Sequence, residues 1–148
     1  FKLHRFLLIE FSMDIEIFFE SPYAQCSYIP ECKTVMVVWS GKQTNQEYKK
    51  AILECLEFQK NSKFPIINYI SDIRNQSIVD PEARKWFENV ALPKAVNQGL
   101  KRAAVISDSN AFKKYHFDMI YQVVGVYKLP MKHFDNLEDA FQWFCTFD

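Results

Sequence analysis

The residues from Phe64 to Ile106 constrain the fold most, because they predict one complete strand, helix, strand unit. The apolar run Pro65–Ile70 is rich in strand-forming residues, and the polar stretch Ser71–Asn75 is expected to be its exit. Asp80-Pro81 is a typical helix start, and apolar residues then recur at helical spacing. A second buried strand is predicted over Ala103–Ile106. Such a unit implies parallel strands covered by a helix.

The first forty residues favour strands that run antiparallel to one another. Asp14–Phe19 alternates polar and apolar side chains, as a strand with one wet face does. Two further β-rich runs, Tyr23–Ile29 and Lys33–Trp39, are separated by the turn at Pro30-Glu31. We therefore predict an N-terminal antiparallel meander that passes into the strand, helix, strand unit.

Four helices are expected beside these strands. Thr44 and Glu47 form a capping box that opens the first, and Pro93 inside the second predicts a kink or a shift of its axis. Helical spacing continues from Phe112 to Ile120, and the last strand, Met131–Phe134, leads into a final helix that Asn136 caps. The predicted fold class is therefore α/β, a mixed sheet flanked by about four helices.

Composition narrows the class of partner. The 18 basic and 18 acidic residues cancel over 148 residues, and no basic run is present, which argues against nucleic acid. No stretch reaches the ~20 apolar residues of a membrane span. The four cysteines lack CxxC spacing and suit a reducing cytoplasm. We expect one domain over residues 13–148, with residues 1–12 as an N-terminal appendage if Met13 is a native start.

Aromatic residues make up 16% of the chain, which permits two interpretations. The rings fill the core, or some of them line an apolar cavity or a self-association face. Trp143 lies off the apolar stripe of the final helix and is the best single candidate for an interface contact.

Two polar clusters follow the predicted parallel strands, where ligands favour the crevice outside the carboxyl ends. They comprise Ser71, Asp72, Arg74 and Asn75, and Ser107, Asp108 and Ser109. An anion or a partner is one interpretation of these clusters; ordinary helix caps and a loop ion pair are the other. We predict no catalytic set, no metal site and no cofactor, because no nucleophile motif, ligand spacing or Gly-rich loop is present.

Several short motifs resemble the bacterial family related to the STAS domain of anti-sigma-factor antagonists and to the lipid-binding Sec14 lobe. They are Tyr69–Arg74, Trp86, Leu92-Pro93, Gly99–Val105 and Phe134–Ala140, in this order from about Met13 to the end. The resemblance implies a mixed sheet flanked by helices and a family whose members generally have no assigned activity.

One departure concerns the phosphorylatable serine that STAS antagonists carry at the start of the helix after the Asp-bearing strand. The corresponding residues Ile78–Ala83 contain no hydroxyl, and Ser77 is only a poor substitute. A phosphoserine switch at that turn is therefore not expected.

Three functions remain open. The first is a non-enzymatic cytoplasmic regulatory or protein-interaction domain of STAS-like type, acting through a protein partner or as a homodimer. The second, implied by the Sec14 side of the resemblance, is a carrier or sensor of a small apolar ligand held between a helix and the sheet. The third is an enzyme of unknown reaction that uses Asp72 and Asp108, which requires a carboxylate with a raised pKa in a pocket.

Overall fold

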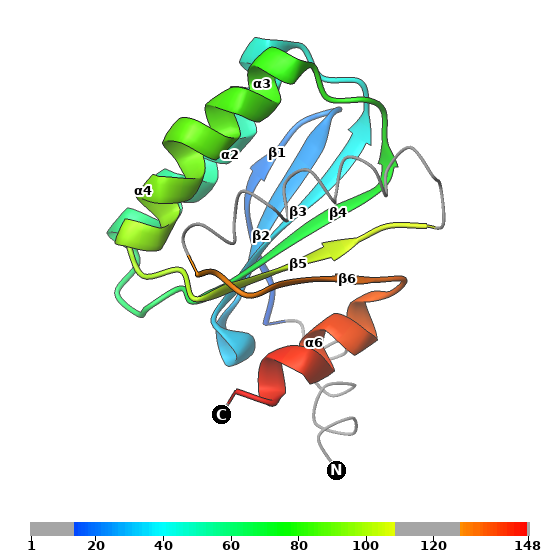
Figure 1. Ribbon diagram of the computed structural model, residues 1–148. Helices are drawn as coiled ribbons and strands as arrows, with labels where there is room; N and C mark the ends of the chain where they lie inside the picture. Colours follow the sequence, from blue (N-terminus) through cyan, green and yellow to red (C-terminus); the bar gives the residue numbers. More distant parts are fainter. Residues whose placement is uncertain (1–13, 109–127, 148) are drawn as a thin grey trace.

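A computed structural model describes residues 14–108 and 128–147 of the chain, and these residues build one six-stranded sheet. The strands follow one another across the sheet in chain order (Figure 1). They are β1 (Glu16–Glu20), β2 (Ala24–Ile29), β3 (Thr34–Gly41), β4 (Asn68–Gln76), β5 (Arg102–Ile106) and β6 (Met131–Phe134).

The direction of the strands changes at β3. β1, β2 and β3 pair antiparallel, whereas β3, β4, β5 and β6 pair parallel. Short turns join the antiparallel strands, whereas a parallel pair needs a longer crossover. One helix crosses between β3 and β4, and another crosses between β4 and β5. The predicted mixed sheet, a meander followed by βαβ units, is confirmed.

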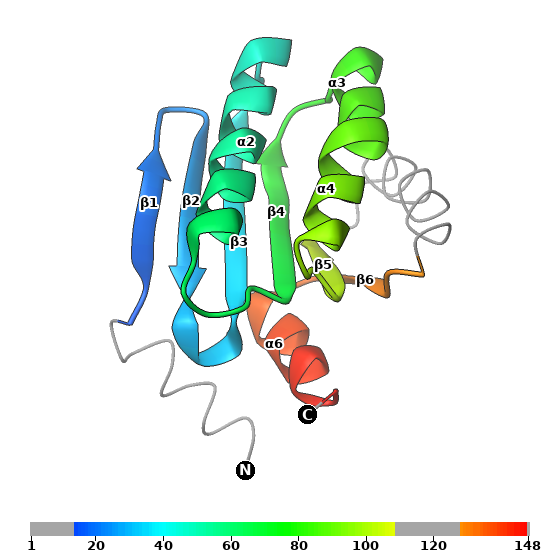
Figure 2. The same cartoon turned by 90° about the vertical axis from the view of Figure 1, so that its left-hand side faces the viewer.

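Helices lie on both faces of the sheet. One face carries α2 (Asn45–Asn61) and a second, continuous helix made of α3 (Pro81–Trp86), η2 (Phe87–Ala91) and α4 (Leu92–Asn97) (Figure 2). The opposite face carries α6 (Leu137–Cys145), and a short 3-10 turn, η1 (Pro30–Cys32), joins β2 to β3. The helix predicted from Phe112 to Ile120 lies outside the described residues.

Two helices begin at the capping residues that the sequence predicts. The Thr44 hydroxyl accepts a hydrogen bond from the Glu47 amide at 3.1 Å, and the Glu47 carboxylate accepts one from the Thr44 amide at 2.9 Å. The Asn136 side chain accepts from the Asp139 amide at 2.8 Å and so starts α6. Each cap satisfies amides that the first turn of a helix leaves without a partner, so both starts are fixed locally.

The irregularity predicted at Pro93 takes the form of a wider turn. Proline has no amide hydrogen, so the helix loses one of its usual bonds at this position. In η2, immediately before it, the Leu92 amide donates to the Phe87 carbonyl five residues back, as in a π-helix. The wide turn lets the helix continue through Pro93 to Asn97 without a break.

The bounds of β4 differ from the prediction, which ended the strand at Ile70 and assigned Ser71–Asn75 to a loop. The strand begins at Asn68 and continues to Gln76. Ser71 and Asp72 pair with β3 on one side and with β5 on the other, whereas Asn75 and Gln76 pair with β3 alone. Pairing in the centre of a sheet thus overrides the weak strand propensity of the side chains.

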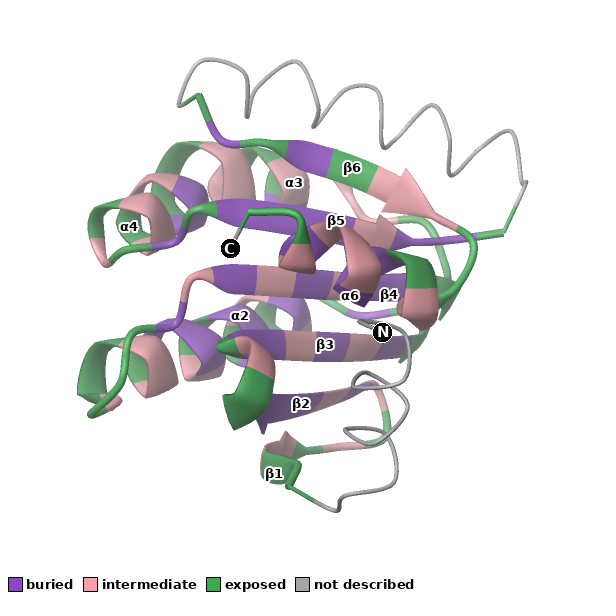
Figure 3. Cartoon of the chain, turned by 90° about the horizontal axis from the view of Figure 1, so that it is seen from below, coloured by how far each residue is buried: buried purple, intermediate pink, exposed green. Residues whose placement is uncertain are grey.

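Two apolar clusters occupy the two faces of the sheet. The larger packs α2 and the second helix against β2, β3 and β4, and it includes Trp39, which is 1% exposed. The smaller packs α6 against the other face and includes Ile70, Ile106 and Phe144. Figure 3 shows buried residues along the central strands and exposed ones along the outer helix surfaces.

Candidate functional site

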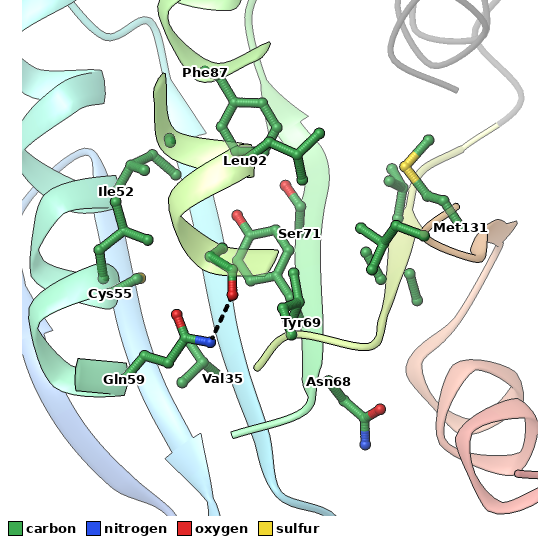
Figure 4. Close-up of a pocket in the computed structure, with 18 of the residues that line it drawn as sticks. Val35, Ile52, Cys55, Gln59, Asn68, Tyr69, Ser71, Phe87, Leu92 and Met131 are labelled. Carbon is green, nitrogen blue, oxygen red and sulfur yellow. Dashed lines mark hydrogen bonds between the residues drawn. The ribbon is translucent and has the colours of Figure 1, made fainter. Parts of the chain in front are cut away.

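A cavity of about 100 Å³ lies between the two helices of the larger cluster and the sheet. Its walls come from α2, from the second helix and from β3, β4 and β5, and apolar side chains dominate them (Figure 4). Alanines at 91, 95 and 103 face it, and their short side chains leave space that the surrounding rings do not fill. A cavity partly lined by rings was one of the two interpretations of the aromatic content, and this one lies between helices and the sheet, where the Sec14 side of the resemblance places an apolar ligand.

A small group of polar atoms interrupts this apolar lining. The Trp39 indole N–H donates to the Ser71 hydroxyl at 3.2 Å, which ties β3 to β4 across the cavity wall. The Tyr48 ring stacks on Trp39 with their centroids 4.9 Å apart. Tyr69 lies two residues before Ser71 on the same face of β4, and both side chains line the cavity.

Burial changes the acidity of both tyrosines. The pKa of Tyr48 is raised from its ordinary value of 10.0, first by burial and then by the nearby Glu88 carboxylate. The pKa of Tyr69 is raised well above the same value, mainly by burial, although a hydrogen bond with Ser71 opposes part of this rise. Both phenols are therefore neutral at physiological pH.

The stability of the protein should fall at alkaline pH because of Tyr48. In the unfolded chain this phenol loses its proton above pH 10, whereas the folded protein keeps it, so the unfolded state then binds fewer protons. The contribution is complete below pH 10 and is lost as pH rises toward the folded pKa, at about 1.4 kcal/mol per pH unit. Urea unfolding between pH 9 and pH 11.5 should give a flatter profile for Tyr48→Phe than for the wild type. Equal slopes would contradict this assignment.

Gln59 lines the cavity, and Gln98 holds it in place by a hydrogen bond. The Gln59 amide donates to the Ala95 carbonyl at 3.2 Å and to the Ile66 carbonyl at 3.4 Å. Gln98 donates to Gln59 at 2.9 Å, and so links the ends of the two helices. These residues were not predicted from the sequence, because a glutamine on a helix gives no signal that distinguishes a bridge from a solvated side chain.

The first predicted polar cluster is divided between the two faces of the sheet. Ser71 lines the cavity, whereas Asp72, the next residue on the strand, points to the opposite face. Asp72 is buried and accepts three hydrogen bonds from Arg74, from the backbone amide and from two guanidinium nitrogens at 3.2, 3.0 and 2.7 Å. Arg74 and Asn75 are exposed. The four residues therefore do not form one polar loop. Ser71 belongs to the cavity, and Asp72 and Arg74 form an ion pair on the other face.

The second predicted cluster contributes a contact with His133. The Ser107 hydroxyl donates to the Asp108 carbonyl at 2.8 Å, and His133 Nε2 lies 3.0 Å from this hydroxyl and 3.3 Å from the Ser107 carbonyl. Because a carbonyl can only accept, the tautomer with its hydrogen on Nε2 satisfies both contacts. The Ser107 hydroxyl already donates its own hydrogen to the Asp108 carbonyl. Ser109 lies outside the described residues.

The two clusters do share one edge of the sheet. Asp72 on β4 pairs with Ile106 on β5. Asp108 comes two residues after Ile106, so it also lies at the edge where the carboxyl ends of these strands meet. Asp108 is exposed, whereas the Asp72 side chain is 5% exposed. A role of these residues in ligand or partner contact stays a prediction.

Trp143 is half-buried on α6. Its ring contacts Phe134, Phe144 and Phe147 at centroid distances of 5.8, 5.6 and 5.3 Å. Phe147 is 43% exposed, so the ring group reaches the surface at this end of the chain. Its part in an interface stays a prediction.

Over residues 14–108 and 128–147, no three His, Cys, Asp or Glu side chains gather closely enough to hold a metal ion. Within the same residues, no helix is long and apolar enough to cross a membrane. All four cysteines are free thiols.

A mixed sheet of this strand order with helices on both faces is an α/β domain of SpoIIAA-like fold. The chain matches the SpoIIAA-like family over residues 34–145, and it belongs to that family. A solved structure with this fold is an uncharacterised protein of the DUF3478 family from Shewanella loihica PV-4, at 19% identity and a TM-score of 0.56. The match covers 88% of this chain and 92% of that one. No curated protein matches the chain.

Proposed function

We propose that this SpoIIAA-like domain is a non-enzymatic binding domain that holds a small apolar ligand between its helices and its sheet. The observation that carries the proposal is the cavity of about 100 Å³. An engineered cavity of about 150 Å³ in another protein binds benzene, so this space suits a ligand of about five or six non-hydrogen atoms, or one end of a longer molecule.

The energetic cost of leaving such a space empty supports the proposal. Residual cavities reduce stability by roughly 24 cal/mol per Å³, which corresponds to about 2 kcal/mol for a volume of about 100 Å³. One larger side chain in place of Ala91 or Ala103 would fill it. A ligand that replaces the missing contacts recovers this energy on binding.

The enzyme hypothesis is less well supported. The carboxylate it needs, Asp72, is engaged by Arg74 in three hydrogen bonds and faces away from the cavity. Among the described residues, the Ser107 hydroxyl lies beside His133, but it already donates its hydrogen to the Asp108 carbonyl. Binding without turnover is therefore the better proposal.

We extend the proposal to a regulatory role, in which occupancy of the cavity is read by a protein partner or a second copy of the chain. The free thiols are consistent with a reducing cytoplasm. Trp143 and the exposed Phe147 beside it supply the ring group through which such a contact would form.

Native mass spectrometry of protein purified from cells tests both parts. A stoichiometric small-molecule adduct supports the ligand-binding proposal, and the same spectrum reports whether the chain is a dimer. Added benzene, used as a probe at saturating concentration, should raise the melting temperature of an adduct-free preparation. A protein without an adduct that also fails to bind benzene would contradict the proposal.

Filling the cavity should abolish this binding without unfolding the protein. Ala91 is 1% exposed and lines the cavity, so Ala91→Leu is expected to weaken benzene binding at least tenfold while the free energy of unfolding stays within about 1 kcal/mol of the wild type. Calorimetric titration measures the first effect and urea unfolding the second.

Ala140→Leu is the matched control. Ala140 is equally buried but packs against the opposite face of the sheet, away from the cavity. The added atoms should overpack that cluster and cost about 1–3 kcal/mol, yet benzene binding should persist. If both variants lose stability equally, the space near Ala91 does not accept additional atoms.

A further inference from the structure

Arg102 is a buried cation at the start of β5. Only 9% of the residue is exposed. Strand alternation puts its side chain on the same face as Ile106, which packs against α6 on the side of the sheet opposite the cavity. Arginine keeps its charge in proteins, and a charge taken out of water needs an opposite charge or several hydrogen bonds to replace its hydration. The partners of this guanidinium therefore decide whether its charge is compensated.

The described residues supply one neutral acceptor and one ring. Arg102 Nη1 donates to the Asn68 side-chain oxygen at 3.1 Å. The Asn68 side-chain nitrogen donates to the Cys32 carbonyl at 2.7 Å, which leaves the oxygen for Arg102. The guanidinium carbon lies over the Phe147 ring, 4.2 Å from its centroid, and such a cation–π contact supplies no oxygen. Within residues 14–108 and 128–147, no carboxylate forms a salt bridge with Arg102.

One edge of the guanidinium has no hydrogen-bond acceptor among the described residues. Arg102 Nε is covered and has no partner. Nη2 also donates to none of the described residues but is not among the covered atoms, so the edge is open at this end. The N–H groups of Nε and Nη2 point the same way in one plane, at a spacing that the two oxygens of a carboxylate match. The unused edge therefore fits an anion with two oxygens in one plane.

The edge lies where a small molecule can reach it. α6 ends beside the amino ends of β4 and β5, as Figures 1 and 3 show. Phe147 follows α6 and is 43% exposed, so the ring over the guanidinium is itself at the surface. A shift of this one ring uncovers the edge without any change in the sheet. A site beside a residue that is 9% exposed admits a small group and not a broad surface.

We propose that Arg102 binds a small carboxylate through Nε and Nη2, with Asn68 orienting the guanidinium and Phe147 covering it. The carboxylate accepts two charge-assisted hydrogen bonds and neutralises the buried cation. Arg102 and Phe147 do not line the cavity, so this site is a second one on the other face of the sheet. It does not rest on the proposed function.

Acetate is the probe, followed by the NMR signals of the arginine Nε–H groups in ¹⁵N-labelled protein. The Arg102 signal is identified by its loss in Arg102→Lys. It should shift in a saturable way with acetate, and not with sodium chloride at the same ionic strength. Arg74 is the control within the same spectrum, because its Nε and Nη2 already donate to Asp72. Acetamide has the shape of acetate without its charge and should bind at least about tenfold more weakly.

Melting temperatures give a second measurement that does not depend on the Arg102 signal. Acetate should raise the melting temperature of the wild type relative to sodium chloride, because it binds the folded state. Arg102→Lys keeps the charge but not the fork, so most of this rise should be lost. Arg74→Lys is the matched control variant and should keep the rise, since the Arg74 fork is occupied by Asp72.

Three results would overturn the proposal, and none of them concerns benzene or the cavity. The first is an equal response of the Arg74 and Arg102 signals, or equal effects of acetate and acetamide, since neither requires a fork on Arg102. Preferential binding of inorganic phosphate would contradict the choice of a carboxylate. If the Arg102 signal responds to acetate only in Asp148→Asn, the chain's own carboxylate occupies the site and binding of a free carboxylate is wrong.

Discussion

Replacing Trp39 with Ala should lower the free energy of unfolding by about 3–5 kcal/mol, the range for removing a fully buried aromatic side chain. Trp39 is 1% exposed, stacks on Tyr48 and donates to Ser71, so the change removes ring contacts and a hydrogen bond together. It also enlarges a cavity that is already present. Urea unfolding followed by circular dichroism measures the loss.

Trp39→Phe separates the ring from its N–H group. It keeps an aromatic side chain against Tyr48 but leaves the Ser71 hydroxyl without its donor, and we expect a smaller loss of about 1–2 kcal/mol. Trp86→Ala is the matched control, because it removes a tryptophan that is only half-buried. The Lys49 Nζ atom lies over the Trp86 ring, 5.7 Å from its centroid. If Trp39→Ala lowers the free energy of unfolding no more than Trp86→Ala does, Trp39 is not central to the packing.

The order of strands and helices could be predicted because local signals mark their ends. The capping box at Thr44 and the proline at 81 determine where two helices begin, and neither depends on distant residues. The extent of β4 could not be predicted in this way. Its polar second half is a strand because it pairs with β3 as far as Gln76 and with β5 as far as Asp72, and that pairing is a tertiary contact.

The site was predicted less well than the fold, for the same reason. Ser71 and Asp72 are adjacent in sequence, and as loop residues they were expected to act together, but strand alternation sends them to opposite faces. The contact between Ser107 and His133 depends on the register of β5 and β6, which the sequence does not specify. The cavity depends on small side chains that meet across three elements, and an alanine in a pattern gives no sign of such a meeting.

Arg74→Ala should lower the free energy of unfolding by about 1–3 kcal/mol, because it leaves the Asp72 carboxylate buried without its cation. The two guanidinium contacts at 3.0 and 2.7 Å form a fork on this carboxylate, and the same contact raises the pKa of Arg74. The loss stays below that of a fully buried pair because the Arg74 side chain is 42% exposed, and water can replace part of its contribution.

Two further variants assign the cause of this loss. Arg74→Lys keeps the charge but not the fork, and should recover only part of the stability. Adding Asp72→Asn to Arg74→Ala removes the stranded charge and should also recover part of it, which a double-mutant cycle by urea unfolding quantifies. A loss below about 0.5 kcal/mol for Arg74→Ala would contradict a structural role. The ion pair would then be better explained as a surface contact that leaves Arg74 available to a partner at the carboxyl ends of the strands.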